Sequence, residues 1–462
     1  MTRVHLIGIG GIGMSALAHL ALDRGWQVTG SDRQPSEITF ELEARGVLID
    51  LEQTGRFIEP DVLCVYSSAV KSKNAEWVKG QALHCRLMHR SEFLKQMMEG
   101  KIPIMVTGAH GKTTTTALLV AVFRQAGLNP SYAIGGRIPQ DRHARFQSGP
   151  HFIYEADESD GSFLNGQPDG AIFINIDQEH LDYWKSLDRL IAGFLQGMQN
   201  VGNRSRLILN FADPYLVKLA EQIGVRAACD LQASDISVSL EGTSFNLIEY
   251  GRSDQAMTIK LVGEHYVQNA LLVIRLARAY GIEDEFIQQG FKKFQGVSRR
   301  FEMIGSIHET WIVDDYAHHP TEIDAVLKSL ERMEDQLSIC VIFQPHRYFR
   351  LEALFDEFVA VFHRKIDLVL LPIYAASEGV IEGLEDRFAS KLRPGRLVRC
   401  LKDEAMNFLE REIENYDVVI TMGAGDVTHL GRAFLKDRSQ RAACPHHGME
   451  SNQKKGKGFL PA

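Results

Sequence analysis

Residues 103–120 read PIMVTGAHGKTTTTALLV, and the rest of the fold can be worked out from this stretch. An apolar run that suits a buried strand ends at Thr107, and a glycine-rich turn leads into a helical run from Thr114 to Gln125. A strand, a glycine turn and a helix in this order predict a P-loop. Backbone N–H groups around Gly111 would cradle phosphate oxygens.

The two residues after Gly111 fit the same interpretation. Lys112 would neutralise phosphate charge, and the hydroxyl of Thr113 would bind Mg²⁺. Only the compact G-x-x-G-K-T half of the motif matches, because the strict spacing needs glycine where this chain has Val106.

Composition limits the class of protein. A chain of 462 residues predicts about three domains. It is 45% apolar and 24% charged, with 39 Gly and 14 Pro, which excludes disorder, collagen and coiled coil for the chain as a whole. A net charge of −8 argues against nucleic acid as a main partner.

Cysteine usage and hydropathy predict a cytoplasmic protein. The six cysteines are scattered without a C-x-x-C pair, so we expect reduced thiols. The apolar run Leu6–Leu22 contains four glycines and His19, which favours a strand, turn and helix over a targeting segment. We find no run long enough for membrane insertion.

Strand-length apolar segments alternate with helical patterns along most of the chain, which predicts an α/β fold with mainly parallel sheets. Between Ser234 and Val262 the pattern changes to polar–apolar alternation, typical of antiparallel hairpins. We therefore expect an N-terminal Rossmann-like domain (1–100), a central P-loop ATPase-type domain with a flanking antiparallel sheet (101–296), a C-terminal Rossmann-like domain (297–437) and a disordered tail (438–462).

A second glycine motif lies near the N-terminus. Gly8, Gly10 and Gly13 follow a predicted strand, and Asp32 comes about twenty residues later. The glycines would let a pyrophosphate approach the helix N-terminus. The alternatives are a tight turn without a ligand and a nicotinamide-dependent oxidoreductase with Asp32 on a ribose.

Two acidic clusters follow predicted strands in the central region. Four carboxylates lie within Glu155–Asp160, and the stretch Asn175–His180 adds two more and an imidazole. Oxygen ligands with one imidazole suit magnesium or manganese better than zinc. A solvated acidic loop is the alternative.

Arginines after a predicted strand mark the last third of the chain. Arg347 and Arg350 could bind a small anionic substrate with bidentate geometry. Salt-bridged surface arginines would give the same pattern.

Nine stretches in one order resemble the ATP-dependent Mur ligases of peptidoglycan synthesis. They are HLIGIGGIGMSALA, SSAV with HRSEFL, TGAHGKTTTT, EADESDGSFL, NIDQEHLD, SRRFE, DDYAHHPTE, QPHRY and MGAGDV. The resemblance implies three domains that bind a UDP-sugar, ATP and an amino acid in that order. It also implies that the N-terminal glycine loop holds uridine diphosphate rather than NAD.

The resemblance assigns roles to particular residues. For ATP they are Gly108, His110, Gly111, Lys112, Thr113, Thr114, Asn269, Arg300 and Asp315. For the UDP-sugar they are Gly8, Gly10, Gly11, Gly13, Asp32, Ser67 and Ser68. For the amino acid they are Tyr316, His346, Arg347 and Arg350, and for the metal Thr113, Glu155 and His180. The implied catalytic residues are Lys112, Glu155, His180 and Arg300.

The implied activity joins L-alanine to the lactyl carboxylate of UDP-N-acetylmuramate through an acyl phosphate, with ATP and Mg²⁺ or Mn²⁺, in a monomer or weak homodimer. Since Arg300 and Asp315 lie in the predicted C-terminal domain and the P-loop lies in the central one, we expect the C-terminal domain to close over the nucleotide. Three alternatives stay open: a peptide-recycling ligase for the same UDP-sugar, the oxidoreductase, and a non-catalytic nucleotide sensor. The chain departs from the family pattern at Tyr266, Ser377 and Gln196.

Overall fold

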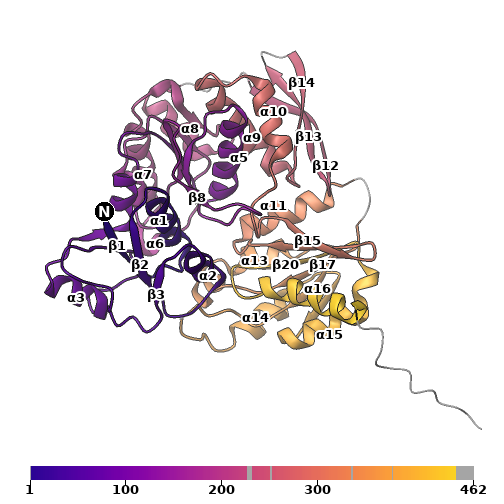
Figure 1. The fold of residues 1–462 in the computed structure, drawn as a ribbon. Helices are drawn as coiled ribbons and strands as arrows, with labels where there is room; N and C mark the ends of the chain where they lie inside the picture. The colour runs from indigo at the N-terminus through magenta and orange to yellow at the C-terminus, as the bar shows by residue number, and fades with distance from the viewer. Residues whose placement is uncertain (1, 226–230, 250–251, 334–336, 377, 444–462) are drawn as a thin grey trace, which may run out of the picture. The chain divides into compact units, whose positions relative to one another are not determined.

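The computed structural model describes residues 2–225, 231–249, 252–333, 337–376 and 378–443. The chain forms two compact units (Figure 1). The first comprises residues 1–302 and 321–336, and the second comprises residues 303–320 and 337–462.

The N-terminal sheet of the first unit is parallel throughout. Its spatial order is β3 (Leu48–Asp50), β2 (Gln27–Ser31), β1 (Arg3–Ile7), β4 (Leu63–Tyr66) and β5 (Leu87–His89). The helices are α1 (Ile12–Asp23), α2 (Glu37–Ala44), α3 (Ala75–Ala82) and α4 (Arg90–Met97). Alternating strands and helices of this kind confirm the predicted Rossmann-like architecture.

The P-loop strand lies inside the second sheet of this unit. The spatial order is β11 (Leu207–Leu209), β10 (Gly170–Phe173), β6 (Ile102–Thr107), β9 (His151–Glu155), β7 (Ser131–Ala133) and β8 (Ala144–Arg145). β6 pairs in parallel with both β9 and β10. Because carboxyl ends of parallel strands meet at one edge, the P-loop and both acidic clusters lie together.

Helices and a small sheet complete the first unit. Its remaining helices are α5 (Lys112–Gln125), η1 (Ser162–Asn165), α6 (Leu181–Trp184), α7 (Leu187–Gln199), η2 (Arg204–Arg206), α8 (Pro214–Gln222), α9 (Glu264–Ala279), α10 (Asp284–Lys293) and α11 (Pro320–Glu331). The predicted hairpins are confirmed as the antiparallel sheet β12 (Leu231–Ser239), β13 (Gly242–Glu249) and β14 (Arg252–Ile259).

The second unit contains another sheet built mainly from parallel strands. The order is β15 (Glu302–Ile307), β16 (Thr310–Asp315), β20 (Val418–Met422), β17 (Ile339–Phe343), β18 (Asp367–Leu370) and β19 (Arg396–Arg399). The helices are α12 (Tyr348–Ala353), α13 (Phe355–Val361), α14 (Leu384–Lys391), α15 (Lys402–Glu412), η3 (Ile413–Asn415) and α16 (Thr428–Ala443).

The disordered tail was predicted to begin at residue 438, but helix α16 extends beyond that residue. Helical backbone continues to Ala443, so irregular chain from residue 438 was the wrong expectation. Residues 444–462 lie outside the described part. Across the described ranges, none of the helices has the length and apolar character that crossing a membrane requires.

One apolar core is shared by the N-terminal sheet and the P-loop sheet of the first unit. Leu6 and Leu17, which belong to the N-terminal sheet and its helix α1, are in the same buried cluster as Tyr154 and Phe173 of the P-loop sheet. The second unit has its own core around Ile342. The N-terminal and P-loop layers are therefore packed as one body.

Candidate functional site

The P-loop has the backbone geometry that its glycines predict. Gly111 has a φ of +81° at the N-cap of α5, a conformation that favours glycine. A Cβ at Gly108 would lie 3.0 Å from the backbone N of Asn175, so a side chain does not fit there. The loop thus leads into a helix whose first N–H groups can meet a phosphate.

Asn175 holds this loop from the neighbouring strand end. Its Oδ1 accepts from the N–H of His110 at 2.8 Å, and its Nδ2 donates to the His110 carbonyl at 3.2 Å. Asn175 was expected at a strand end, but it was not among the predicted site residues. An amide immediately after a strand that neighbours the P-loop strand was the available signal.

Lys112 is already engaged by oxygen atoms. Its Nζ lies 2.7 Å from Oε2 of Glu158 and donates to the carbonyls of Gly108 and Ala109. Burial alone would lower the pKa of Lys112, but Glu158, Asp157 and Glu155 together raise it above its ordinary value. The lysine is therefore a fixed cation at the phosphate site.

Glu155, one of the predicted metal ligands, lies beside the first turn of α5. Its Oε1 accepts from Thr113 Oγ1 at 3.1 Å, and its Oε2 accepts from the N–H of Gly135 at 2.7 Å. A Cβ at Gly135 would lie about 2.5 Å from the carboxylate, so a side chain there would displace the carboxylate from its present position. Burial raises the pKa of Glu155.

His180 joins two carboxylates that the predicted metal set did not include. Its Nε2 lies 3.6 Å from Oε1 of Glu158 and 3.7 Å from Oε2 of Glu179. That Glu158 oxygen is buried and has no hydrogen-bond partner among the described residues. A buried oxygen without a donor, beside another carboxylate and an imidazole, fits a hard divalent cation.

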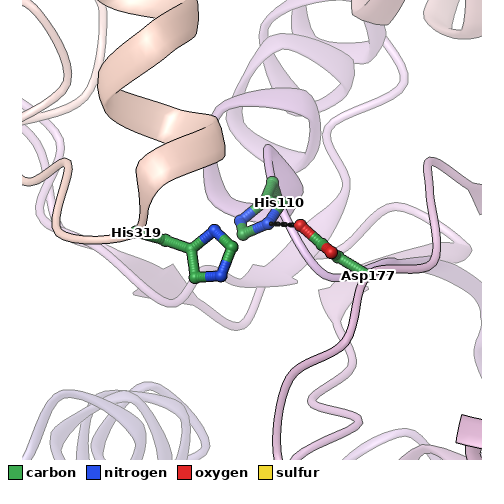
Figure 2. Close-up of side chains that lie close together, drawn as sticks. All are labelled: His110, Asp177 and His319. Atoms are coloured by element: carbon green, nitrogen blue, oxygen red, sulfur yellow. Dashed lines mark hydrogen bonds and ion pairs between the residues drawn. The ribbon is translucent and has the colours of Figure 1, made fainter. Parts of the chain in front are cut away.

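His110 is held between two carboxylates of the same unit. Figure 2 shows its ring directed at Asp177, with Nε2 at 2.8 Å from Oδ2. Its Nδ1 lies 3.4 Å from Oε1 of Glu322. Burial opposes the charged form, but these carboxylates raise the pKa of His110 to about 10. The P-loop therefore carries a second cation at neutral pH.

Three other predicted ATP residues lie in this unit. The Nδ2 of Asn269, on α9, would be 3.0 Å from a Cβ at Gly111, so its amide touches the loop. The Nη1 of Arg300 lies 3.5 Å from Glu322 Oε1. Thr114 is buried within the first turn of α5.

The N-terminal glycine loop borders a cleft of about 870 Å³. The predicted sugar residues in its lining are Gly8, Gly10, Gly11, Gly13, Asp32 and Ser67. Asp32 Oδ2 accepts from the N–H of Gly10 at 2.8 Å, which fixes the loop. Ser68 is absent from that lining and donates instead to Asp160 at 2.7 Å.

Arg90 connects the cleft to the acidic edge of the P-loop sheet. It is part of the cleft lining, and its Nη2 lies 3.0 Å from Asp160 Oδ2 and 3.4 Å from Asp157 Oδ2. Arg90 is the arginine of HRSEFL and was not among the predicted site residues. The glycine cleft and the phosphate site therefore adjoin in one unit.

Three family models match the chain along most of its length. The Mur ligase family catalytic domain matches residues 3–102, the Mur ligase middle domain residues 106–277, and the Mur ligase glutamate ligase domain residues 299–425. This chain belongs to the Mur ligase family.

Curated relatives and a solved structure agree with this assignment. A UDP-N-acetylmuramate–L-alanine ligase from a Geobacter species is 37% identical, covering 94% of this chain and 97% of its own. One of the same name from Geotalea daltonii is 36% identical, with coverage of 94% and 97%. A UDP-N-acetylmuramate-alanine ligase structure from Thermotoga maritima is 27% identical, with a TM-score of 0.80, and covers 95% of this chain and all of that one.

The second unit of this Mur ligase gathers the predicted amino-acid residues. His346 stacks on Tyr374 with ring centroids 5.5 Å apart, and Arg350 Nη1 lies 3.3 Å from His346 Nδ1. His318 lies between Tyr316 and His346, with centroid distances of 5.0 and 5.9 Å. Burial and neighbouring cations lower the pKa of His346 to about 4, so its ring is neutral near pH 7.

Arg347 and Asp315 complete the residues predicted for this unit. Arg347 Nε donates to Glu378 Oε1 at 2.5 Å, a carboxylate that the predicted set left out. Asp315 lies at the end of β16 and accepts from the N–H of Ala317 at 2.7 Å.

The departures from the family pattern have different settings in this Mur ligase. Tyr266 is buried in the core of the first unit, whereas Gln196 is exposed on α7. Ser377 lies outside the described residues, as do Cys229 and Cys444. The cysteines that the structure does describe, Cys64, Cys85, Cys340 and Cys400, are free thiols.

Proposed function

We propose that this Mur ligase is a cytoplasmic, ATP-dependent ligase that joins L-alanine to the lactyl carboxylate of UDP-N-acetylmuramate. The observation that carries the proposal is that Arg90 lines the glycine cleft and pairs with Asp157 and Asp160, on the acidic edge of the P-loop sheet. A UDP-sugar bound along the cleft would place its carboxylate end near the nucleotide phosphates. The names of the relatives support the choice of substrates.

The residues of the first unit support carboxylate activation. Phosphoryl transfer depends mainly on positioning and charge neutralisation, and Lys112 and His110 supply two fixed positive charges at the loop. The γ-phosphoryl group would pass from ATP to the lactyl carboxylate, with ADP leaving. A bound Mg²⁺ or Mn²⁺ would neutralise phosphate charge, and Thr113, Glu155, Glu158 and His180 would hold it.

The residues of the second unit support amino-acid binding. The guanidinium groups of Arg350 and Arg347 can pair with the α-carboxylate of L-alanine. Its amine would attack the acyl phosphate, forming the C–N bond as phosphate leaves and a proton is lost.

The test is phosphate release from Mg-ATP with UDP-N-acetylmuramate. L-alanine, glycine, L-serine, a tripeptide and no amino acid are offered in parallel. We expect release that requires the sugar and is fastest with L-alanine. Turnover with the tripeptide alone would instead establish a peptide-recycling ligase, and an absorbance change with NAD(H) would establish the oxidoreductase.

A further inference from the structure

A hairpin in the P-loop sheet lies between the glycine cleft and Glu155. Its strands β7 and β8 pair antiparallel, and a hydrogen bond of 2.9 Å from the N–H of Ile134 to the carbonyl of His143 extends the pair by one residue. Helix α1, whose first turn lines the cleft, packs on β8. The hairpin therefore contacts both of the sites that the proposed reaction has to use together.

His143 fastens one leg of this hairpin to α1. It is 2% exposed, and its Nε2 lies 3.0 Å from the hydroxyl oxygen of Ser15. Ser15 belongs to the first turn of α1, where its N–H donates to the carbonyl of Gly11 at 2.8 Å. Burial lowers the pKa of His143 to about 4, so the ring is neutral near pH 7. The contact is therefore a hydrogen bond between neutral groups, directly behind the glycine loop.

The other leg of the hairpin holds the carboxylate of Glu155. Gly135, the residue after Ile134, donates its N–H to Oε2 at 2.7 Å, whereas Oε1 accepts from Thr113 of α5. The orientation of the carboxylate is thus set by the hairpin on one side and by α5 on the other. A carboxylate that is already oriented loses less conformational freedom when a cation binds, so it binds the cation more tightly.

We propose that His143 is a positioning residue that couples occupation of the glycine cleft to cation binding at Glu155. The coupling would pass through three hydrogen bonds: Ser15 with His143, His143 with Ile134, and Gly135 with Glu155. A ligand whose phosphates meet the first N–H groups of α1 would fix that turn, and with it the hairpin and the carboxylate. The inference rests on the proposed function, because it takes this ligand to be the UDP-sugar.

A second contact between the hairpin and α1 provides a matched control. Nη1 of Arg142 lies 2.8 Å from Oδ1 of Asp23, the last residue of α1. This pair joins the same two elements, but at the end of the helix away from the glycine loop. Asp23 keeps Arg45 as a partner when Arg142 is replaced. Loss of Arg142 should therefore weaken the contact between the layers without freeing the first turn of α1.

The test measures the dissociation constant of Mn²⁺ on the full chain by EPR, with and without saturating UDP-N-acetylmuramate and in the absence of ATP and L-alanine. For the wild type we expect the UDP-sugar to lower this constant about tenfold, within the usual range for coupled sites. His143→Leu and Ser15→Ala are each expected to reduce the effect to less than about twofold. His143→Gln, whose amide can replace the ring Nε2, is expected to keep most of it, and Arg142→Gln all of it.

Thermal unfolding checks that each variant folds, and Ser15→Ala provides the result if His143→Leu does not. A full effect of the UDP-sugar in either folded variant would overturn the proposal, and so would an equal loss in Arg142→Gln. A wild type that binds the UDP-sugar and Mn²⁺ independently of each other would also overturn it. If calorimetry showed no binding of the UDP-sugar to the wild type, the proposed function would fail and this inference with it.

Discussion

Side chains at the P-loop are charged and paired before any ligand binds. Lys112 with Glu158 and His110 with Asp177 are both partly enclosed ion pairs. Because removing one partner leaves a buried charge without compensation, single substitutions here affect stability as well as activity.

For Lys112→Ala we expect loss of ADP formation by at least a hundredfold, because phosphate charge is no longer neutralised. Binding of UDP-N-acetylmuramate, measured by calorimetry, is expected to change little, since its proposed cleft is lined by other residues. The exposed Lys292→Ala serves as the control. Loss of sugar binding in a folded Lys112 variant would contradict the separation of the two sites.

The raised pKa of His110 predicts a stability that depends on pH. A pKa shifted from 6.5 to about 10 adds stability that is complete below pH 6.5 and disappears as pH rises through 10. Urea unfolding of wild type and His110→Gln is expected to differ by on the order of 3 kcal/mol at pH 6 and by far less above pH 10. His84→Gln, at an exposed site, is the control, and a difference that does not change with pH would contradict the prediction.

The roles of individual residues could be predicted only in part. The sequence indicated that carboxylates follow β9, but a turn has no fixed period, so nothing in it showed that Glu158 rather than Asp157 faces Lys112. Asn175 was missed for the same reason. Residues fixed by a motif, such as Gly111, could be placed because the backbone conformation itself demands them.

At the level of elements, the loop before α14 positions the start of α12. Glu378 accepts from the side chain of Arg347 and from the backbone N–H of Phe349, so one carboxylate orients a functional arginine and a helix end. The arginine therefore depends on a residue 31 positions away in sequence.

Arg347→Ala is expected to raise the KM for L-alanine at least tenfold and to change the KM for ATP less than twofold. Glu378→Gln is expected to have a smaller effect of the same kind, because Arg347 keeps its charge but loses its orientation. Arg387→Ala, which breaks an exposed pair with Glu352, is the control. Equal changes in both KM values would remove Arg347 from the amino-acid pocket.

Elements were predictable where apolar runs were long enough to show a period. The apolar run that begins at residue 103 and ends at Thr107 is observed as β6, within one residue of its predicted start. No strand was predicted at β5, β7 or β8, whose two or three residues show little periodicity. The predicted end of the ordered chain, at residue 437, lies before the observed end of α16, because the last turns of this helix are rich in polar residues.

At the level of the whole molecule, the two units have separate cores, and we expect calorimetry to resolve two unfolding transitions. UDP-N-acetylmuramate is expected to raise the midpoint temperature of only the first unit's transition, because the ligand binds the folded form of that unit. Leu409→Ala, in the buried core of the second unit, is expected to reduce the unfolding free energy of that unit alone, by about 2–5 kcal/mol. Only the second unit's transition would then move to a lower temperature. The exposed Leu401→Ala is the control, and a fall of both transitions would indicate a single cooperative body.

The pairing of Lys112 with Glu158 has a consequence for the order in which ligands accumulate. When a nucleotide phosphate pairs with Lys112, the buried carboxylate of Glu158 loses its counter-ion. A nucleotide that binds alone therefore meets an electrostatic penalty. A divalent cation at Glu158 removes that penalty. Since such a coupling acts equally in both directions, each ligand increases the affinity of the resting protein for the other by the same factor.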